Sequence, residues 1–146
     1  MEKPKLEILM VPPSSWGYTL ANTLEKSKWD KIRREVYNEA GYKCELCGNY
    51  KEELHCHEHW IWNDKKGTQT LDRLICVCKT CHDCIHIRRS QTIYKPKYIK
   101  HLINHILKVN NWKIEDLEYY LKKLDTEFEG RKNKHYIVIV GKRRLV

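Results

Sequence analysis

The sequence predicts an α+β fold, in which a few short strands and several helices pack around a small core. Three observations carry this prediction: two CxxC pairs about 30 residues apart, an extended stretch between them, and two apolar helical stripes after them. Hydrophobic residues make up 41% of the 146 residues, which is enough for the core of one compact domain.

The first element expected is a helix that follows an irregular segment, residues 1–26. Pro12 and Pro13 disfavour a helix within that segment. Ser27 can cap the helix, with Asp30 three residues further on. Gly41 is a natural stop. The apolar residues that share one face of this helix are Trp29, Ile32, Val36 and Ala40.

The central unit is expected to span residues 27–93. Residues 54–62 mix polar and apolar side chains and predict an extended stretch or a strand pair. Residues 63–67 supply turn chemistry. The apolar run 71–77 leads into the second CxxC pair, and a helix is expected to continue from there to Arg88 or Arg89.

Residues 94–146 are expected to form a helical extension that ends in a basic strand. Asn110 and Asn111 separate its two helices, and Gly130 ends the second. Residues 136–140 are β-branched and predict a short strand. The two apolar stripes are Ile99, Leu102, Ile103 and Ile106, then Ile114, Leu117, Leu121, Leu124 and Phe128.

The net charge of +9 and the pI of about 9.2 favour an anionic partner, of which nucleic acid is the commonest. No apolar run approaches the roughly 20 residues of a membrane helix, and the N-terminus lacks the long apolar region of a signal peptide. A cytoplasmic protein without a membrane partner is therefore expected.

Seven cysteines, an odd number, argue against a disulfide framework and favour metal ligation. Two residues between paired cysteines let both sulfurs reach one tetrahedral ion, and a full set of four thiolates is typical of structural zinc. The alternatives for the second pair involve Cys76 and Cys84, and Cys56 fits a small buried residue. The preferred ligands, with the second pair preceding a helix, are Cys44, Cys47, Cys78 and Cys81.

Histidines crowd between and after these pairs, and here the sequence resembles the HNH endonucleases, or ββα-metal nucleases. The resemblance covers about residues 29–88 and rests on AGYKCELCG at 40–48, LHCHEHW at 54–60 and LICVCKTCHDCIH at 74–86. It implies a zinc-stabilised ββα core that cuts DNA with one divalent metal, Mg²⁺ or Mn²⁺. It also implies that Glu58 is a metal ligand, His59 the general base and His82 a second metal ligand. His86, one helical turn on, would bind the metal or a phosphate.

A second alignment of the strand puts His57 and Glu58 at the paired positions, with Glu58 in place of the base. A carboxylate is a poorer base than an imidazole near neutral pH, so the Glu58-His59 register is preferred. The middle asparagine of the family pattern is absent where Asp72 or Arg73 stands. The cations expected to contact the DNA backbone are Lys65, Lys66, Arg73, Lys79, Arg88, Arg89, Lys142, Arg143 and Arg144.

Three functional hypotheses follow from the sequence. The first is a metal-dependent DNA endonuclease that hydrolyses phosphodiester bonds. The second is a catalytically decayed zinc module that binds nucleic acid or a protein. The third is a small protein whose histidines hold a second structural zinc. The C-terminal helices are expected either to form a homodimer or to complete the core.

Overall fold

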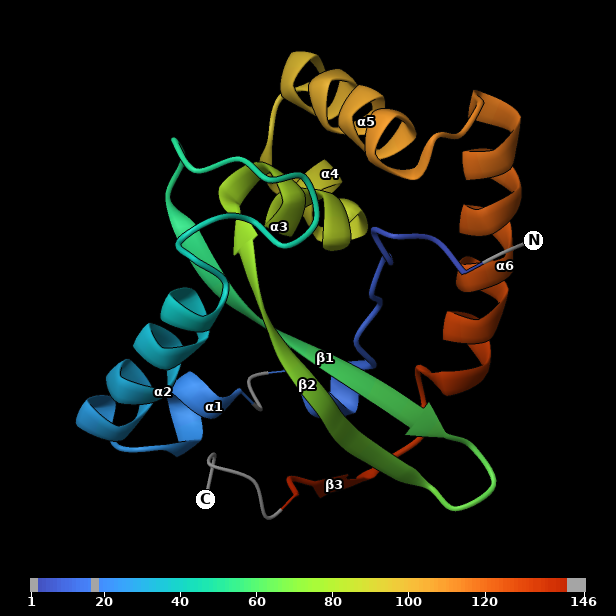
Figure 1. The fold of residues 1–146 in the computed structure, drawn as a ribbon. Coiled ribbons are helices and arrows are strands. Elements are labelled where there is room, and N and C mark those ends of the chain that lie inside the picture. Colours follow the sequence, from blue (N-terminus) through green and yellow to red (C-terminus); the bar gives the residue numbers. More distant parts are fainter. Residues whose placement is uncertain (1–2, 17–18, 142–146) are drawn as a thin grey trace.

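Figure 1 shows the computed structural model, which describes residues 3–16 and 19–141. The fold is mixed α+β, with one three-stranded sheet and helices around it, as the sequence predicts. The elements in chain order are a 3-10 turn at Pro13–Ser15, α1 (Leu20–Thr23), α2 (Lys26–Glu39), β1 (Leu54–Asn63), β2 (Thr68–Cys78), α3 (Lys79–Ile85), α4 (Ile87–Ile93), α5 (Pro96–Asn110), α6 (Ile114–Arg131) and β3 (Ile137–Ile139).

The sheet is centred on β2, which pairs antiparallel with β1 and parallel with the short β3. β1 and β2 form a hairpin whose turn contains Gly67 at φ +65°, a left-handed conformation that glycine adopts without strain. The register shifts between the pairs His59–Arg73 and Trp60–Leu71. Asp72 is therefore the extra residue of a β-bulge.

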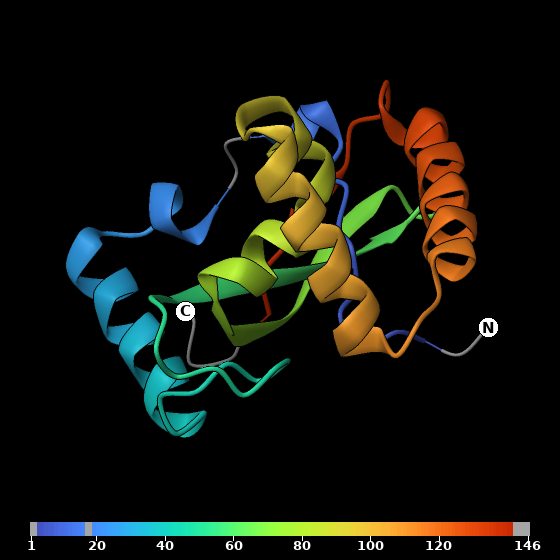
Figure 2. The same ribbon diagram turned by 90° about the horizontal axis from the view of Figure 1, so that it is seen from above.

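The two faces of the hairpin pack against different helices. Side chains alternate between faces along a strand, so His55, His57 and His59 lie together on one face, here called the histidine face. This face packs on α3 and on the N-terminal segment. The opposite face, here called the α2 face, contributes Trp60 and Leu71 to a core with α1 and α2. Figures 1 and 2 show α2 and α6 at opposite flanks of the molecule.

The N-terminal segment belongs to the main core. Leu6 is fully buried and Ile8 is 4% exposed, among residues of α3, α5 and α6. The Leu6 amide donates to Asn110 Oδ1 at 2.8 Å, and Asn110 Nδ2 donates to the Leu6 carbonyl at 3.0 Å. The Ile8 amide donates to the Tyr120 hydroxyl at 3.2 Å. These contacts fix Glu7, which lies between the two buried residues, against the histidine face.

Several boundaries differ from the sequence prediction. The N-terminal residues contain the 3-10 turn and α1, although 1–26 were expected to be irregular. The Ser27 cap is wrong, because α2 begins at Lys26 and Asp30 pairs instead with Arg33. The helix expected to run through Arg88 breaks at His86, which has φ −101° and ψ 45°.

The end of α6 also differs from the prediction. Gly130 does not end the last helix, which continues to Arg131. By contrast, Asn111 adopts the left-handed conformation that closes α5, with φ 53°, so the predicted separation of α5 from α6 is confirmed.

Candidate metal centres

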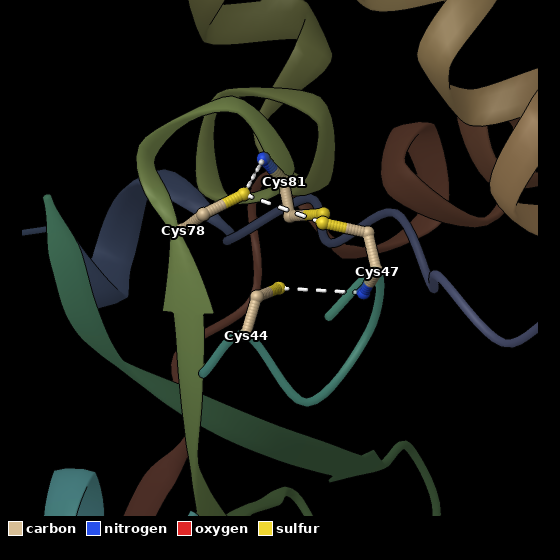
Figure 3. Close-up of side chains that lie close together, drawn as sticks. All are labelled: Cys44, Cys47, Cys78 and Cys81. Carbon is tan, nitrogen blue, oxygen red and sulfur yellow. Dashed lines mark hydrogen bonds between the residues drawn. The ribbon is translucent and has the colours of Figure 1, made fainter. Parts of the chain in front are cut away.

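Four cysteine thiols from two chain segments meet at one point. Cys44 and Cys47 come from the loop after α2, Cys78 ends β2, and Cys81 lies in the first turn of α3 (Figure 3). Their sulfur atoms all lie within 4.8 Å of one another, and Cys47 Sγ is 3.7 Å from Cys78 Sγ. Tetrahedral zinc places its thiolate sulfurs about 3.8 Å apart, so this arrangement is compatible with a zinc site. The structure thus brings together the four cysteines that the CxxC spacing predicts.

Backbone amides and neighbouring thiols already stabilise negative charge in this cluster. The amides of Leu46 and Cys47 donate to Cys44 Sγ at 3.4 and 3.5 Å. Hydrogen bonds from the thiols of Cys78 and Cys81 lower the pKa of Cys44. The same hydrogen bond to Cys44 raises the pKa of Cys81. Several thiolates so close together repel one another. A divalent cation would supply the positive charge that lets all four ionise.

The other three cysteines have different surroundings. Cys84 is fully buried, its thiol donates to the Leu102 carbonyl at 3.4 Å, and burial raises the pKa of this thiol. Burial also raises the pKa of Cys76 to about 11. Cys56 faces Cys76 across the hairpin. Among the described residues, none of these three cysteines belongs to a group that could hold a metal ion. The fold therefore assembles the preferred second pair, Cys78 with Cys81.

Three imidazoles form a second group beside the thiols. His57 comes from the histidine face of β1, His82 from the first turn of α3, and His86 from the residue that ends α3. One ring nitrogen from each lies within 4.8 Å of the other two. The i, i+4 spacing puts His82 and His86 on one side of the helix. Strand alternation turns His57 toward them.

These three rings are held neutral at ordinary pH. Burial, together with the neighbouring histidines, lowers the pKa of His57 well below its usual range. Burial is also the main reason why the pKa of His82 falls to about 3 and that of His86 to about 4. A neutral imidazole keeps a lone pair free for a metal. Three of them are a donor set typical of transition-metal ions rather than of Mg²⁺.

Glu58 lies on the other side of β1. Its two carboxylate oxygens accept hydrogen bonds from the Leu20 amide at 3.3 and 3.4 Å, at the start of α1. Burial raises the pKa of Glu58 to about 7. The sequence groups Glu58 with His82, whereas the structure groups His57 and His86 with His82 and turns the Glu58 carboxylate toward the α2 face.

His59 is on the histidine face and is only 6% exposed. Its Nε2 lies 2.9 Å from Glu7 Oε2, and its Nδ1 lies 3.1 Å from Asp72 Oδ2. The β-bulge supplies this second partner, since Asp72 is its extra residue. The hydrogen bond from His59 is the main reason why the pKa of Glu7 is lowered.

Sequence reasoning missed two residues of this region. His55 belongs to the histidine cluster in the sequence, but no role was assigned to it; its Nδ1 lies 2.8 Å from His82 Nδ1. Its place two residues before His57 was the available signal, because i and i+2 share a strand face. Glu7 gave no signal, because it meets His59 across 52 residues of sequence.

The predicted DNA-contacting cations differ in exposure and in their partners. Lys65, Lys66, Arg73 and Arg89 are exposed, and Arg73 Nε also lies 3.8 Å from Asp72 Oδ2. Lys79 instead donates to Asp83 at 2.6 Å, and Arg88 pairs with Asp125. The expected contacts at Lys142, Arg143 and Arg144 lie outside the described residues.

In the described part of the chain, no helix combines the length and the apolarity needed to cross a bilayer. Comparisons with protein families, with curated proteins and with solved structures found no match.

Proposed function

We propose that the protein is a metal-dependent DNA endonuclease of the HNH kind, with one divalent ion held by His57, His82 and His86. The observation that carries this proposal is the convergence of one strand imidazole and two helix imidazoles beside the thiol cluster, on a strand–strand–helix unit. In this ligand set His57 replaces Glu58 as the strand residue that binds the metal, as in the His57-Glu58 register. The base, in contrast, stays at His59, as in the Glu58-His59 register.

The donor chemistry favours one of the two ions expected from the sequence. Mg²⁺ prefers carboxylate oxygens and keeps most of its waters, whereas Mn²⁺ also accepts imidazole nitrogen. Three neutral imidazoles therefore fit Mn²⁺, and also Ni²⁺ or Zn²⁺, better than Mg²⁺. When bound, such an ion would neutralise charge on the scissile phosphate and on the leaving oxygen.

We assign proton abstraction from water to His59, which lies two residues beyond His57 on the same face of β1. Asp72 faces Nδ1 and orients the ring, as carboxylates commonly do for catalytic histidines. Nε2 is then the nitrogen that meets water. Glu7 now occupies that position, so its carboxylate must turn away before the reaction can start.

The thiol cluster has a structural role in this proposal. A zinc ion there would join the loop after α2 to the junction of β2 and α3, and four thiolates would leave no open position for substrate. The loop is already docked on β2, since the Glu45 amide donates to the Cys76 carbonyl at 2.9 Å and Glu45 Oε2 accepts from the Cys76 amide at 2.6 Å. The zinc would thereby hold the helix that carries His82 and His86.

Exposed cations on the hairpin would bind the DNA backbone. Arg73 faces His59 across the hairpin, and Lys65 and Lys66 lie in its turn. Contacts of this kind give affinity without choice of sequence. Lys79 and Arg88 have carboxylate partners, but surface ion pairs are weak enough to exchange for phosphate.

A plasmid-nicking assay tests the proposal. Zinc-loaded protein is expected to nick supercoiled DNA with Mn²⁺ and poorly with Mg²⁺. His82→Ala and His59→Ala are both expected to abolish nicking, whereas His101→Ala, an exposed residue on α5, is the matched control and keeps it. Nicking that survives both His82→Ala and His59→Ala would overturn the proposal.

One observation favours a second candidate, a non-catalytic metal module that binds nucleic acid or a protein. Both ring nitrogens of His59 already have carboxylate partners, and the Glu58 carboxylate is hydrogen-bonded to the Leu20 amide. In this candidate the imidazoles of His57, His82 and His86 would hold a second structural zinc. Two tightly bound zinc ions per chain, with DNA binding but no nicking under any metal, would support this candidate.

A further inference from the structure

His82 has two ring nitrogens, and only one of them is free for a metal. Its Nδ1 lies 2.8 Å from Nδ1 of His55, a hydrogen-bond distance, so one of these nitrogens donates and the other accepts. The two rings meet edge to face, with centroids 5.0 Å apart at 89°. His82 Nε2 is therefore the nitrogen left to turn toward His57 and His86.

A carboxylate at the far edge of the His55 ring favours one direction for this hydrogen bond. Glu53 Oε2 lies 3.6 Å from His55 Nε2, which favours a proton on that nitrogen. Nδ1 of His55 is then the acceptor, and Nδ1–H of His82 is the donor. A histidine with its proton on Nδ1 presents the lone pair of Nε2.

The backbone holds His55 in place relative to α3. The Glu53 carbonyl accepts a hydrogen bond of 3.0 Å from the Lys79 amide, the first residue of α3. His55 itself pairs with Val77 in the hairpin, and Val77 is fully buried. The side chain of His55 is 27% exposed, so it packs beside the imidazole group without being sealed within it.

We infer that His55 is a positioning residue: it accepts the Nδ1–H of His82 and so orients the His82 ring to bind the metal through Nε2. This inference rests on the proposed three-imidazole metal centre. Groups that hold the second nitrogen of a ligating histidine fix its tautomer and its ring orientation, and their loss typically costs about 10- to 100-fold in metal affinity.

The test uses Ni²⁺ alone as a probe, titrated calorimetrically into full-length protein whose thiol cluster is loaded with zinc. Wild type is expected to bind one Ni²⁺. His55→Leu removes the acceptor and is expected to weaken Ni²⁺ binding by about tenfold or more. His55→Asn offers its Oδ1 in place of the imidazole Nδ1, and is expected to stay within about threefold of wild type. His101→Leu alters a histidine that stacks on Tyr98 and serves as the control with unchanged affinity.

A measurement on the unmodified protein keeps the inference testable if a variant fails to fold. Nitrogen-15 NMR of zinc-loaded wild type without Ni²⁺ is expected to show His82 with its proton on Nδ1. A proton on Nε2 overturns the inference. Equal losses in His55→Leu and His55→Asn also overturn it, because they would indicate that His55 is itself a ligand.

The same titrations separate this inference from the proposed function. If wild type binds no Ni²⁺ beyond the zinc, the metal centre itself is wrong. If wild type binds Ni²⁺ and His55→Leu binds it equally well, the metal centre stands and the role of His55 is wrong.

Discussion

Cys81 and His82 are consecutive residues in the first turn of α3, yet their side chains enter different groups. Cys81 is fully buried among the thiols, whereas His82 joins His57 and His86. The two candidate metal centres therefore share a single helical turn. Any change that releases Cys81 from its group should also displace His82.

Loss of the thiol ligands is expected to unfold the core. Structural zinc contributes on the order of 10 kcal/mol in small zinc domains. Cys81→Ser should therefore lose both the zinc and the cooperative thermal transition, measured by metal analysis and circular dichroism. Cys84→Ser is the matched control, because Cys84 is equally buried but lies outside the cluster, and it should keep the zinc. A stable Cys81→Ser protein without zinc would contradict this prediction.

Glu58→Gln is expected to stabilise the protein above neutral pH. Burial raises the pKa of Glu58 to about 7, so between pH 4.5 and 7 the native state binds the proton that the unfolded chain has lost. Stability therefore falls as pH rises through this window, and the penalty is complete above pH 7. Glutamine keeps an acceptor for the Leu20 amide and removes the penalty, which gives about 1–3 kcal/mol at pH 8 and little at pH 4.5.

Urea unfolding at pH 8 and at pH 4.5 measures the stability that Glu58→Gln adds. An equal gain in stability at both pH values would contradict the raised pKa of Glu58 as its cause. The same variant tests whether Glu58 takes part in catalysis. Nicking should survive Glu58→Gln if His57 binds the metal and His59 accepts the proton. Nicking should be lost if Glu58 is the metal ligand or the base.

Glu7→Gln is expected to destabilise the protein at pH 7 by about 1–3 kcal/mol, the usual contribution of a hydrogen bond to a charged group. The hydrogen bond from His59 lowers the pKa of Glu7 below 4.5. The stabilisation by ionised Glu7 is therefore present above pH 4.5 and is lost as pH falls through the lowered pKa of Glu7. The melting temperature of Glu7→Gln should lie well below that of wild type at pH 7 and close to it at pH 3. Lys3→Ala, which removes only the exposed ion pair of Glu7, should have little effect at either pH.

Lys65→Ala with Lys66→Ala is expected to weaken DNA binding uniformly across sequences. Each phosphate contact contributes about 0.9 to the slope of log affinity against log salt, so losing two contacts should reduce that slope by about 1–2. Fluorescence anisotropy with a labelled duplex at several salt concentrations measures it. Lys97→Ala with Lys100→Ala changes two exposed cations on α5, at the other end of the molecule from the hairpin turn, and is the control (Figure 1). Equal slopes for the two double variants would place the DNA elsewhere.

The thiol cluster and the long helices could be predicted from sequence because their determinants are local. A CxxC turn brings two sulfurs together within four residues, and only the choice between Cys78 with Cys81 and Cys81 with Cys84 remained. Apolar spacing likewise indicated α5 and α6, whose buried residues include Leu102, Ile106 and Leu117. The Ser27 cap failed because capping contributes only about 1 kcal/mol, which tertiary contacts readily outweigh.

The membership of the imidazole group could not be predicted locally, because it depends on which face of β1 packs on α3. The histidine-rich stretch of β1 alternates between faces, and only pairing with β2 and packing on α3 decides that His57 faces His82 while Glu58 faces Leu20. The bulge at Asp72 and the contact between Glu7 and His59 join residues distant in sequence, so no local pattern encodes them. The sequence by itself determined which side chains could bind metal, because that depends on residue type and spacing. Only the tertiary structure decided which of them meet, because convergence depends on strand register and on chain segments brought together by burial of the core.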